Sequence, residues 1–330
     1  MPDIKRMFSS PEAVQQMRIF AERSLQLYGE ITEELHRLLV QKAEEFGVHR
    51  TELEDFLKEL TPAPSFIINE KDDTQLVLIP GGKFLAGGPA ADQGGCDPFP
   101  VHLPAYYLAL YPVTNIQYAQ FLSQVQPSER EMEKWIRLNS DRSVRRPGYK
   151  YDLYKAGSKY EVYGDKNNHP AGVSWYGAKA YAKWAGLRLP SELEWEKGAR
   201  GVDGRKYPWG NTWDESKCLN QKNPGSEMTC IVQSYPDGRS PWGLYHMFGN
   251  IAEWCEDWYA SESYDCYRKG ILVPLYGNGD RVLRGVSWAS VPDIIRGGFR
   301  SFSGAFQRGG GDPEFPRCDH GFRMARSVIL

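Results

Sequence analysis

The sequence of 330 residues contains no long apolar run and no excess of either charge. No stretch of about 18 apolar residues occurs, which excludes a transmembrane helix, and the opening residues lack the apolar core of a signal peptide. Its 40 basic and 42 acidic residues leave a net charge of −2, so no global field attracts nucleic acid or an anionic membrane. We therefore expect a cytoplasmic protein with neither nucleic acid nor membrane among its partners.

Closely spaced cysteines are also absent. The six cysteines lie far apart, none of them in a Cys-x-x-Cys pair or in a cluster with histidine at zinc spacing. Buried free cysteine is common in cytosolic proteins. The pattern therefore favours free, mostly buried thiols over a zinc site.

Tryptophan, glycine and proline are abundant, with 10, 33 and 22 residues respectively. This mixture is typical of a loop-rich fold held together by aromatic side chains. From Thr74 onward, short strands and Gly/Pro turns accompany two amphipathic helices, predicted near 114–124 and 174–184. A further helix is predicted to start at Pro190-Ser191. Because strands and helices do not alternate as βαβ units, the predicted fold class is α+β.

The chain is predicted to divide into a helical module, a linker and one large domain. Residues 1–60 contain three helical segments, the first of which opens with Pro11 after two serines. Residues 61–73 are predicted to form a linker, and residues 74–330 the large domain. So small a bundle buries little core alone. The module is therefore either a packing appendage or an element that recruits a protein partner.

Eight motifs occur in order along the large domain. They are Leu76–Gly88, Tyr111–Phe121, His169–Trp175, Gly186–Trp195, Tyr207–Asn211, Gly243–Trp254, Arg281–Trp288 and Gly321–Arg326. Together they resemble the formylglycine-generating enzyme family, the sulfatase-modifying-factor domain. This resemblance implies a C-type-lectin-like fold with little regular secondary structure and a binding face built from loops.

Enzymes of that family resemble oxidases that convert a sulfatase cysteine into formylglycine. Their chemistry requires a cysteine pair for Cu(I), placed just after the Gly-x-Ser-aromatic strand. The equivalent stretch here, Ala289–Arg300, contains no cysteine, and Cys318 alone cannot form a two-thiolate site. A second branch, the iron-dependent sulfoxide synthases, carries a His-x-x-x-His-x-Glu motif that the N-terminal helices lack. We therefore expect no catalytic residue and no enzymatic activity.

The resemblance also implies a calcium site around Gly249–Glu253. The carboxylate of Glu253 and the backbone carbonyls of Gly249 and Ile251 would supply hard oxygen ligands. His246 stands where an amide oxygen would be expected, and imidazole is a poor calcium ligand. Calcium is thus one interpretation, and a buried structural hydrogen-bond network is the other.

The segment after Trp288 resembles the C-terminal segment of variable proteins from diversity-generating retroelements, which is a hypermutated ligand-binding surface. Adenine mutagenesis cannot produce Lys, Glu, Gln, Met or Trp, and residues 289–306 contain none of these five. Loops on a rigid frame commonly carry recognition. We therefore predict a recognition surface for a protein or small-molecule ligand at about 289–320. Its predicted ligand-binding residues are Ala289, Ser290, Val291, Asp293, Ile294, Phe299, Ser301, Phe302, Asp312, Asp319 and His320.

Two other interpretations of this segment stay open. Its apolar residues could belong to the core, with Arg296 and Arg300 in structural ion pairs. Alternatively, the chain is a divergent enzyme or pseudo-enzyme that binds sulfatase-like peptides. The tryptophans in or beside the motifs leave a similar choice. We expect Trp175, Trp184, Trp195, Trp209, Trp254 and Trp288 to stabilise long loops as core residues, while a ligand-stacking role for one of them is the alternative.

Overall fold

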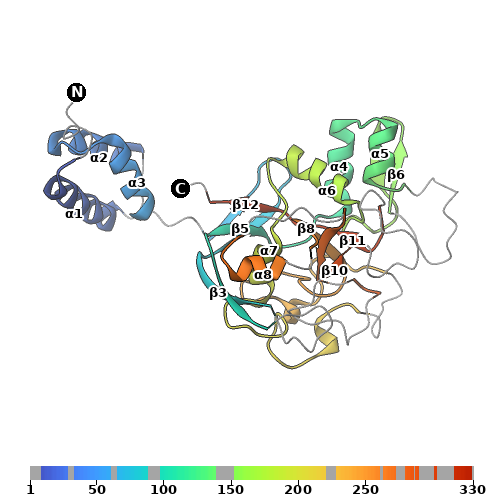
Figure 1. Ribbon diagram of the computed structural model, residues 1–330. Coiled ribbons are helices and arrows are strands. Elements are labelled where there is room, and N and C mark those ends of the chain that lie inside the picture. The colour runs from blue at the N-terminus through green and yellow to red at the C-terminus, as the bar shows by residue number, and fades with distance from the viewer. Residues whose placement is uncertain are drawn as a thin grey trace. The chain divides into compact units, whose positions relative to one another are not determined.

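The computed structural model describes residues 9–28, 33–60, 65–87, 97–138, 152–220, 228–260, 263–272, 279–285, 287–289, 301–302 and 316–328. The chain forms two compact units (Figure 1). The small unit contains Met1–Pro64 and the last three residues, and the large unit contains Ser65–Ser327. In the parts of the chain that are described, no helix is both long enough and apolar enough to cross a bilayer.

The small unit is a bundle of three helices, as the sequence predicts: α1 (Pro11–Tyr28), α2 (Glu33–Phe46) and α3 (Arg50–Leu60). Ser10 caps α1, since its hydroxyl accepts a hydrogen bond from the backbone N–H of Ala13 at 3.1 Å. Apolar side chains of all three helices share one core. Its buried residues are Met17, Ala21, Leu35, Leu39, Ala43, Val48, Leu53 and Leu57.

The first sheet of the large unit has the strand order β1-β2-β5-β12 and is antiparallel throughout. Its strands are β1 (Phe66–Ile68), β2 (Gln75–Ile79), β5 (Tyr106–Ala109) and β12 (Ala325–Ser327). This sheet corrects the predicted linker at 61–73. Residues 66–68 pair with β2 in register from Phe66 opposite Val77, so the large unit begins at Ser65. The proline-rich stretch 61–65 indicated a linker, but the apolar residues Phe66–Ile68 directly after it form a strand.

The second sheet has the order β10-β9-β8-β11. Its strands are β8 (Ala252–Trp258), β9 (Arg281–Arg284), β10 (Ser301–Phe302) and β11 (His320–Gly321). Strands β8, β9 and β10 are antiparallel neighbours, whereas β11 pairs with β8 in parallel. Two hairpins complete the described strands: β3 (Gly82–Ala86) with β4 (Phe99–Leu103), and β6 (Leu153–Ala156) with β7 (Lys159–Val162).

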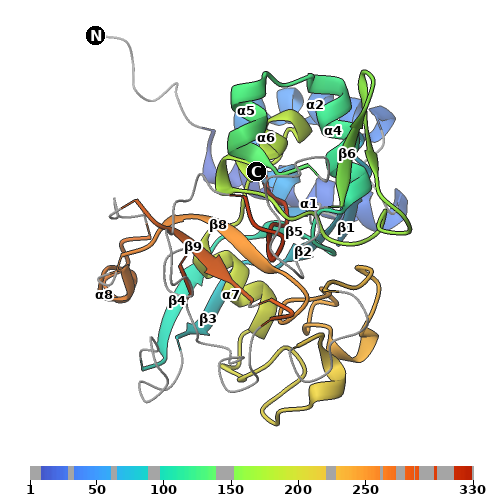
Figure 2. The ribbon, with the colours of Figure 1, turned by 90° about the vertical axis from the view of Figure 1, so that its right-hand side faces the viewer.

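Three helices gather beside β6 in both views of the large unit (Figures 1 and 2). They are α4 (Asn115–Val125), α5 (Glu129–Trp135) and α6 (Trp175–Ala185). The side chains of Thr114, Ser128 and Ser174 cap their N-termini. The helices predicted near 114–124 and 174–184 are thereby confirmed to within one residue. A short helix, α8 (Ser263–Arg268), and the 3₁₀ turns at Glu215–Lys217 and Pro236–Gly238 follow later in the chain.

Helix α7 (Glu192–Arg200) is buried along its whole length. Ser191 caps it, as predicted, and the helix packs against β3, β8 and β9. Its charged residues need buried partners, because an isolated ion inside a protein is very costly. Glu192 and Glu196 both pair with Arg284 of β9, and Glu196 also pairs with Arg200. The centre of the large unit is therefore an ionic network enclosed by apolar side chains, in an α+β fold.

Candidate functional site

Strand β8 and the loop that leads into it are the frame on which both ends of the C-terminal segment are fixed. At the start of the segment, the backbone N–H of Trp288 donates to the carbonyl of Asn250 at 3.0 Å. At its end, His320 and Gly321 pair with Ala252 and Glu253. The sequence between these anchors therefore begins and ends beside one buried strand.

The described residues cover part of the predicted recognition surface. Ala289 is exposed, directly after the anchored Trp288. Ser301 and Phe302 form β10 and pair with Leu283 and Val282 of β9. The other six residues predicted between the anchors lie outside the described residues: Ser290, Val291, Asp293, Ile294, Phe299 and Asp312.

Asp319 and His320 are buried, in contrast to the predicted surface position. The carboxylate of Asp319 accepts hydrogen bonds from Arg317 Nε at 2.8 Å and Nη2 at 2.9 Å. Burial alone would raise the pKa of Asp319, but nearby His320 and Arg317 outweigh it and leave that pKa below its usual value. The imidazole of His320 meets the edge of Trp254, with 5.3 Å between ring centres. Both residues thus belong to the frame, since His320 pairs with Ala252 of β8 and the Asp319 carbonyl accepts from the Ala252 N–H at 3.0 Å.

The loop before β8 owes its shape to two left-handed residues. Gly249 and Asn250 have φ values of 83° and 64°. The Asn250 side chain accepts a hydrogen bond from the backbone N–H of Cys230 at 3.0 Å and donates to the Cys230 carbonyl at 3.2 Å. The carbonyl of Gly249 accepts from the N–H of Ile251 at 2.9 Å. This loop is therefore closed by its own hydrogen bonds.

Glu253 is bound by protein groups on both carboxylate oxygens. Arg323 Nε lies 2.6 Å from Oε2 and Arg323 Nη2 lies 2.7 Å from Oε1, and Trp195 Nε1 donates to Oε2 at 2.8 Å. The guanidinium also donates to the carbonyls of Ala109 and Tyr245. Glu253 and Arg323 therefore form a buried, bidentate ion pair, which is the strongest form of a charge-assisted hydrogen bond.

This geometry does not fit a calcium ion at Glu253. Calcium requires several oxygen ligands turned toward one point, but a guanidinium already occupies the carboxylate. Within the described ranges, no group of three or more His, Cys, Asp or Glu side chains could hold a metal ion. The residues at Gly249, Ile251 and Glu253 therefore match the alternative interpretation, a buried hydrogen-bond network. Sequence reasoning missed the partner Arg323, although a buried glutamate requires a nearby cation; Arg323 lies 70 residues further along the chain.

Burial keeps four of the described thiols protonated at neutral pH. Burial raises the pKa of Cys218 and of Cys318 to about 12, and that of Cys230 to about 11. Burial also raises the pKa of the Cys255 thiol. The thiolate is the form that binds metals. The described cysteines are free, as the sequence predicts, and Cys96 lies outside the described residues.

Buried histidines predict an acid-sensitive fold. Burial and, secondarily, nearby charge lower the pKa of His246 to about 3, and burial lowers that of His320 to about 4. In the unfolded chain both would titrate near 6.5. Between about pH 6.5 and 4 the unfolded state binds more protons, so stability falls as the pH falls through that range. The slope is about 1.4 kcal/mol per pH unit for each histidine.

We expect His246→Asn to flatten this dependence, because asparagine tolerates the φ of 53° at that position and does not titrate. Urea unfolding of both proteins between about pH 7 and pH 5 measures the slope. His102→Asn, at an exposed position in β4, is the control. Equal slopes in the His246→Asn variant and the parent would contradict the assignment.

Two four-stranded sheets, two hairpins and the helices packed with them form a mixed α+β arrangement, which is a C-type-lectin-like fold. The particular family follows from the sequence match. The family model of the sulfatase-modifying factor enzyme 1-like domain matches residues 65–328, so the chain belongs to that family.

Known relatives carry several names. The chain is 38% identical over 265 residues to serine/threonine-protein kinase Pkn1 of Chlamydia trachomatis, covering 77% of this chain and 38% of that protein. It thus spans about two fifths of the chlamydial protein. An inactive Cα-formylglycine-generating enzyme 2 of Mus musculus is 27% identical over 298 residues, covering 82% of this chain and 91% of that protein. The family therefore includes a member that is named as inactive.

Solved structures confirm the fold. PvdO from Pseudomonas aeruginosa aligns with a TM-score of 0.62 and 24% identity, covering 81% of this chain and 100% of that chain. The Treponema denticola variable protein 1 aligns with a TM-score of 0.55 and 20% identity, over 81% and 100% of the two chains. The resemblance to both the enzyme family and a variable protein is thereby borne out at the level of fold.

Proposed function

We propose that this chain is a non-catalytic ligand-binding protein that displays residues 289–315 as a recognition surface. The observation that carries the proposal is the pair of anchors, one on the loop before β8 and one on β8 itself. The Trp288 N–H and the Ala252 N–H bond to Asn250 and Asp319 carbonyls, each at 3.0 Å, on either side of the segment. A segment whose two ends are held in this way can vary in sequence while the residues that hold it stay the same.

The chemistry of the frame supports binding without oxidation. Residues Ala289–Arg300 contain no cysteine, and burial keeps the thiols of Cys218, Cys230 and Cys318 protonated. Buried Asp319 and His320 narrow the surface from the predicted 289–320 to 289–315, because Pro316 is also buried. We therefore assign ligand recognition to residues 289–315, which precede the buried residues that lead to the pairing with β8.

Replacing residues 289–315 with a Gly/Ser-rich sequence of equal length is expected to leave the rest of the large unit folded. Peptides selected from a random display library on the parent chain should lose their binding to this variant. Thermal unfolding followed by circular dichroism, together with interferometry on the selected peptides, measures both effects. Tyr163→Ala, at a residue that is 62% exposed outside the segment, is the binding control.

Two results would overturn the proposal. Loss of the cooperative thermal transition in the replaced variant would assign the segment to the core. Unchanged peptide binding would place recognition elsewhere.

We further propose that a retroelement diversifies this segment. A reverse transcriptase gene beside a near-identical repeat of the 3′ coding end is the expected genomic arrangement, and a locus without them would refute this extension.

A pseudo-enzyme that binds sulfatase-like peptides is the second candidate. It is favoured by the similarity to the mouse protein named as inactive, which extends over most of both chains. Titration of the full chain with a cysteine-containing sulfatase peptide, followed by calorimetry, tests it. Saturable binding that survives replacement of 289–315 would favour this candidate over the first.

A further inference from the structure

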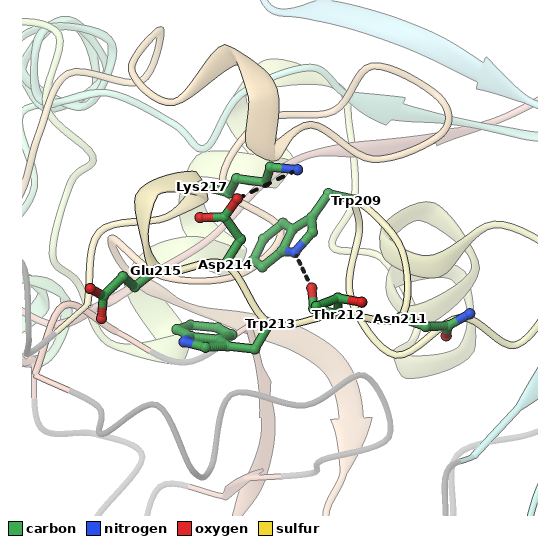
Figure 3. A pocket seen from close by; sticks show the side chains of 7 residues that line it. All are labelled: Trp209, Asn211, Thr212, Trp213, Asp214, Glu215 and Lys217. Carbon is green, nitrogen blue, oxygen red and sulfur yellow. Dashed lines mark hydrogen bonds and ion pairs between the residues drawn. The ribbon is translucent and has the colours of Figure 1, made fainter.

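A cavity of about 550 Å³ lies in the large unit around Trp209 and Trp213 (Figure 3). Its described lining comes from one continuous stretch, 209–217, and includes no residue of the C-terminal segment. Figure 3 shows the carboxylates of Asp214 and Glu215 on one side of the indoles, with Asn211 and Thr212 on the other. Aromatic and polar groups thus face the same space.

The indole of Trp209 is held rigidly. Tyr207 stacks on it with 5.4 Å between ring centres and 6° between planes, and Trp213 packs at 5.9 Å with a tilt of 54°. Its Nε1 donates to the carbonyl of Thr212 at 3.0 Å. Trp213 in turn packs against the main apolar core. A rigid aromatic wall of this kind loses little conformational entropy when a ligand stacks on it.

The polar lining offers hydrogen-bond donors and acceptors of both charges. Asp214 Oδ1 accepts from the Ser216 backbone at 3.0 Å and from its hydroxyl at 2.6 Å, and Lys217 Nζ lies 3.8 Å from Oδ2. Hydrogen bonds from Ser216 lower the pKa of Asp214. The carboxylate therefore accepts hydrogen bonds at neutral pH, while the ammonium of Lys217 donates them beside it.

We propose that this cavity binds a neutral saccharide. Lys217 and Asp214 pair with each other at 3.8 Å, which offsets much of the charge of both groups. A sugar ring carries hydroxyl groups that both donate and accept, and an apolar C–H face that packs on an indole. Trp209 thus takes the ligand-stacking role, and no described residue of 289–315 lines the site.

Saturation-transfer NMR and calorimetry on the full chain, with cellotetraose, maltotetraose and chitotetraose as probes, test the proposal. At least one of the three is expected to bind. Trp209→Ala should weaken that binding about tenfold, since it removes the stacking surface. Tyr163→Ala, a similarly aromatic position outside the cavity, should leave it unchanged. The variant with 289–315 replaced should also bind the sugar, which separates this proposal from the proposed function.

Glu215→Gln provides a second variant with the indole wall intact, at an exposed residue where misfolding is not expected. It should weaken sugar binding several-fold, because a charged acceptor becomes neutral. Three outcomes would overturn the proposal: none of the three sugars binds, sugar binding is the same in both variants as in the parent, or tetramethylammonium chloride binds while the sugars do not.

Discussion

Replacing Arg284 with methionine is expected to lower the free energy of unfolding by about 3–5 kcal/mol. Arg284 Nη1 lies 3.4 Å from Glu192 Oε1, and Nη2 lies 3.1 Å from Glu196 Oε2, with all three side chains fully buried. Removing the cation leaves two carboxylates in an apolar interior, where Glu196 keeps its pair with Arg200. Urea unfolding followed by circular dichroism measures the loss.

Lys179→Met is the matched control for Arg284→Met. Lys179 pairs with Glu256 at 2.7 Å, but the two side chains are 36% and 37% exposed. Such a pair contributes at most about 1 kcal/mol. If the two substitutions cost the same, the buried network between α7 and β9 contributes no more to stability than an exposed ion pair.

The second large effect is expected for Gly249→Ala, with a loss of at least about 2 kcal/mol. The φ of +83° already disfavours alanine, and an added Cβ would lie 2.4 Å from the carbonyl oxygen of Leu219. The loop that leads into β8 would therefore have to shift. Thermal and urea unfolding measure the cost, and binding of library-selected peptides reports whether the frame moves.

Gly157→Ala separates backbone strain from steric contact. Gly157 has a φ of +63°, and an added Cβ there meets no atom within 4 Å. Its expected cost is the backbone penalty alone, about 1–2 kcal/mol. Equal losses at the two glycines would show that the close approach of Gly249 to Leu219 does not constrain the frame.

Local features of this fold could be predicted from the sequence because their causes are local. Thr114, Ser174 and Ser191 each precede a helix and bond to a backbone N–H three residues later, so their caps are visible in the order of residues alone. The eight motifs, taken in their order along the chain, likewise indicated the C-type-lectin-like fold through their resemblance to a known family. Helix boundaries and fold class therefore followed directly.

Long-range pairings could not be predicted in the same way. Glu253 meets Arg323 across 70 residues, and Glu192 meets Arg284 across 92. Without these partners, the sequence left a calcium site at Glu253 open beside the favoured hydrogen-bond network. Asp319 and His320 were assigned to the surface because they are polar and follow a turn-rich segment. Their burial depends on backbone contacts of both residues with Ala252 of β8, which only the folded chain shows.

The most direct measurement is oxygen consumption by the full chain with Cu(I) and a cysteine-containing sulfatase peptide. Because no cysteine lies in Ala289–Arg300, the rate is expected to equal that of peptide and copper without protein. An active formylglycine-generating enzyme measured in parallel establishes that the assay works. Sustained turnover, with formylglycine detected by mass spectrometry, would contradict a protein that binds its ligand without oxidising it.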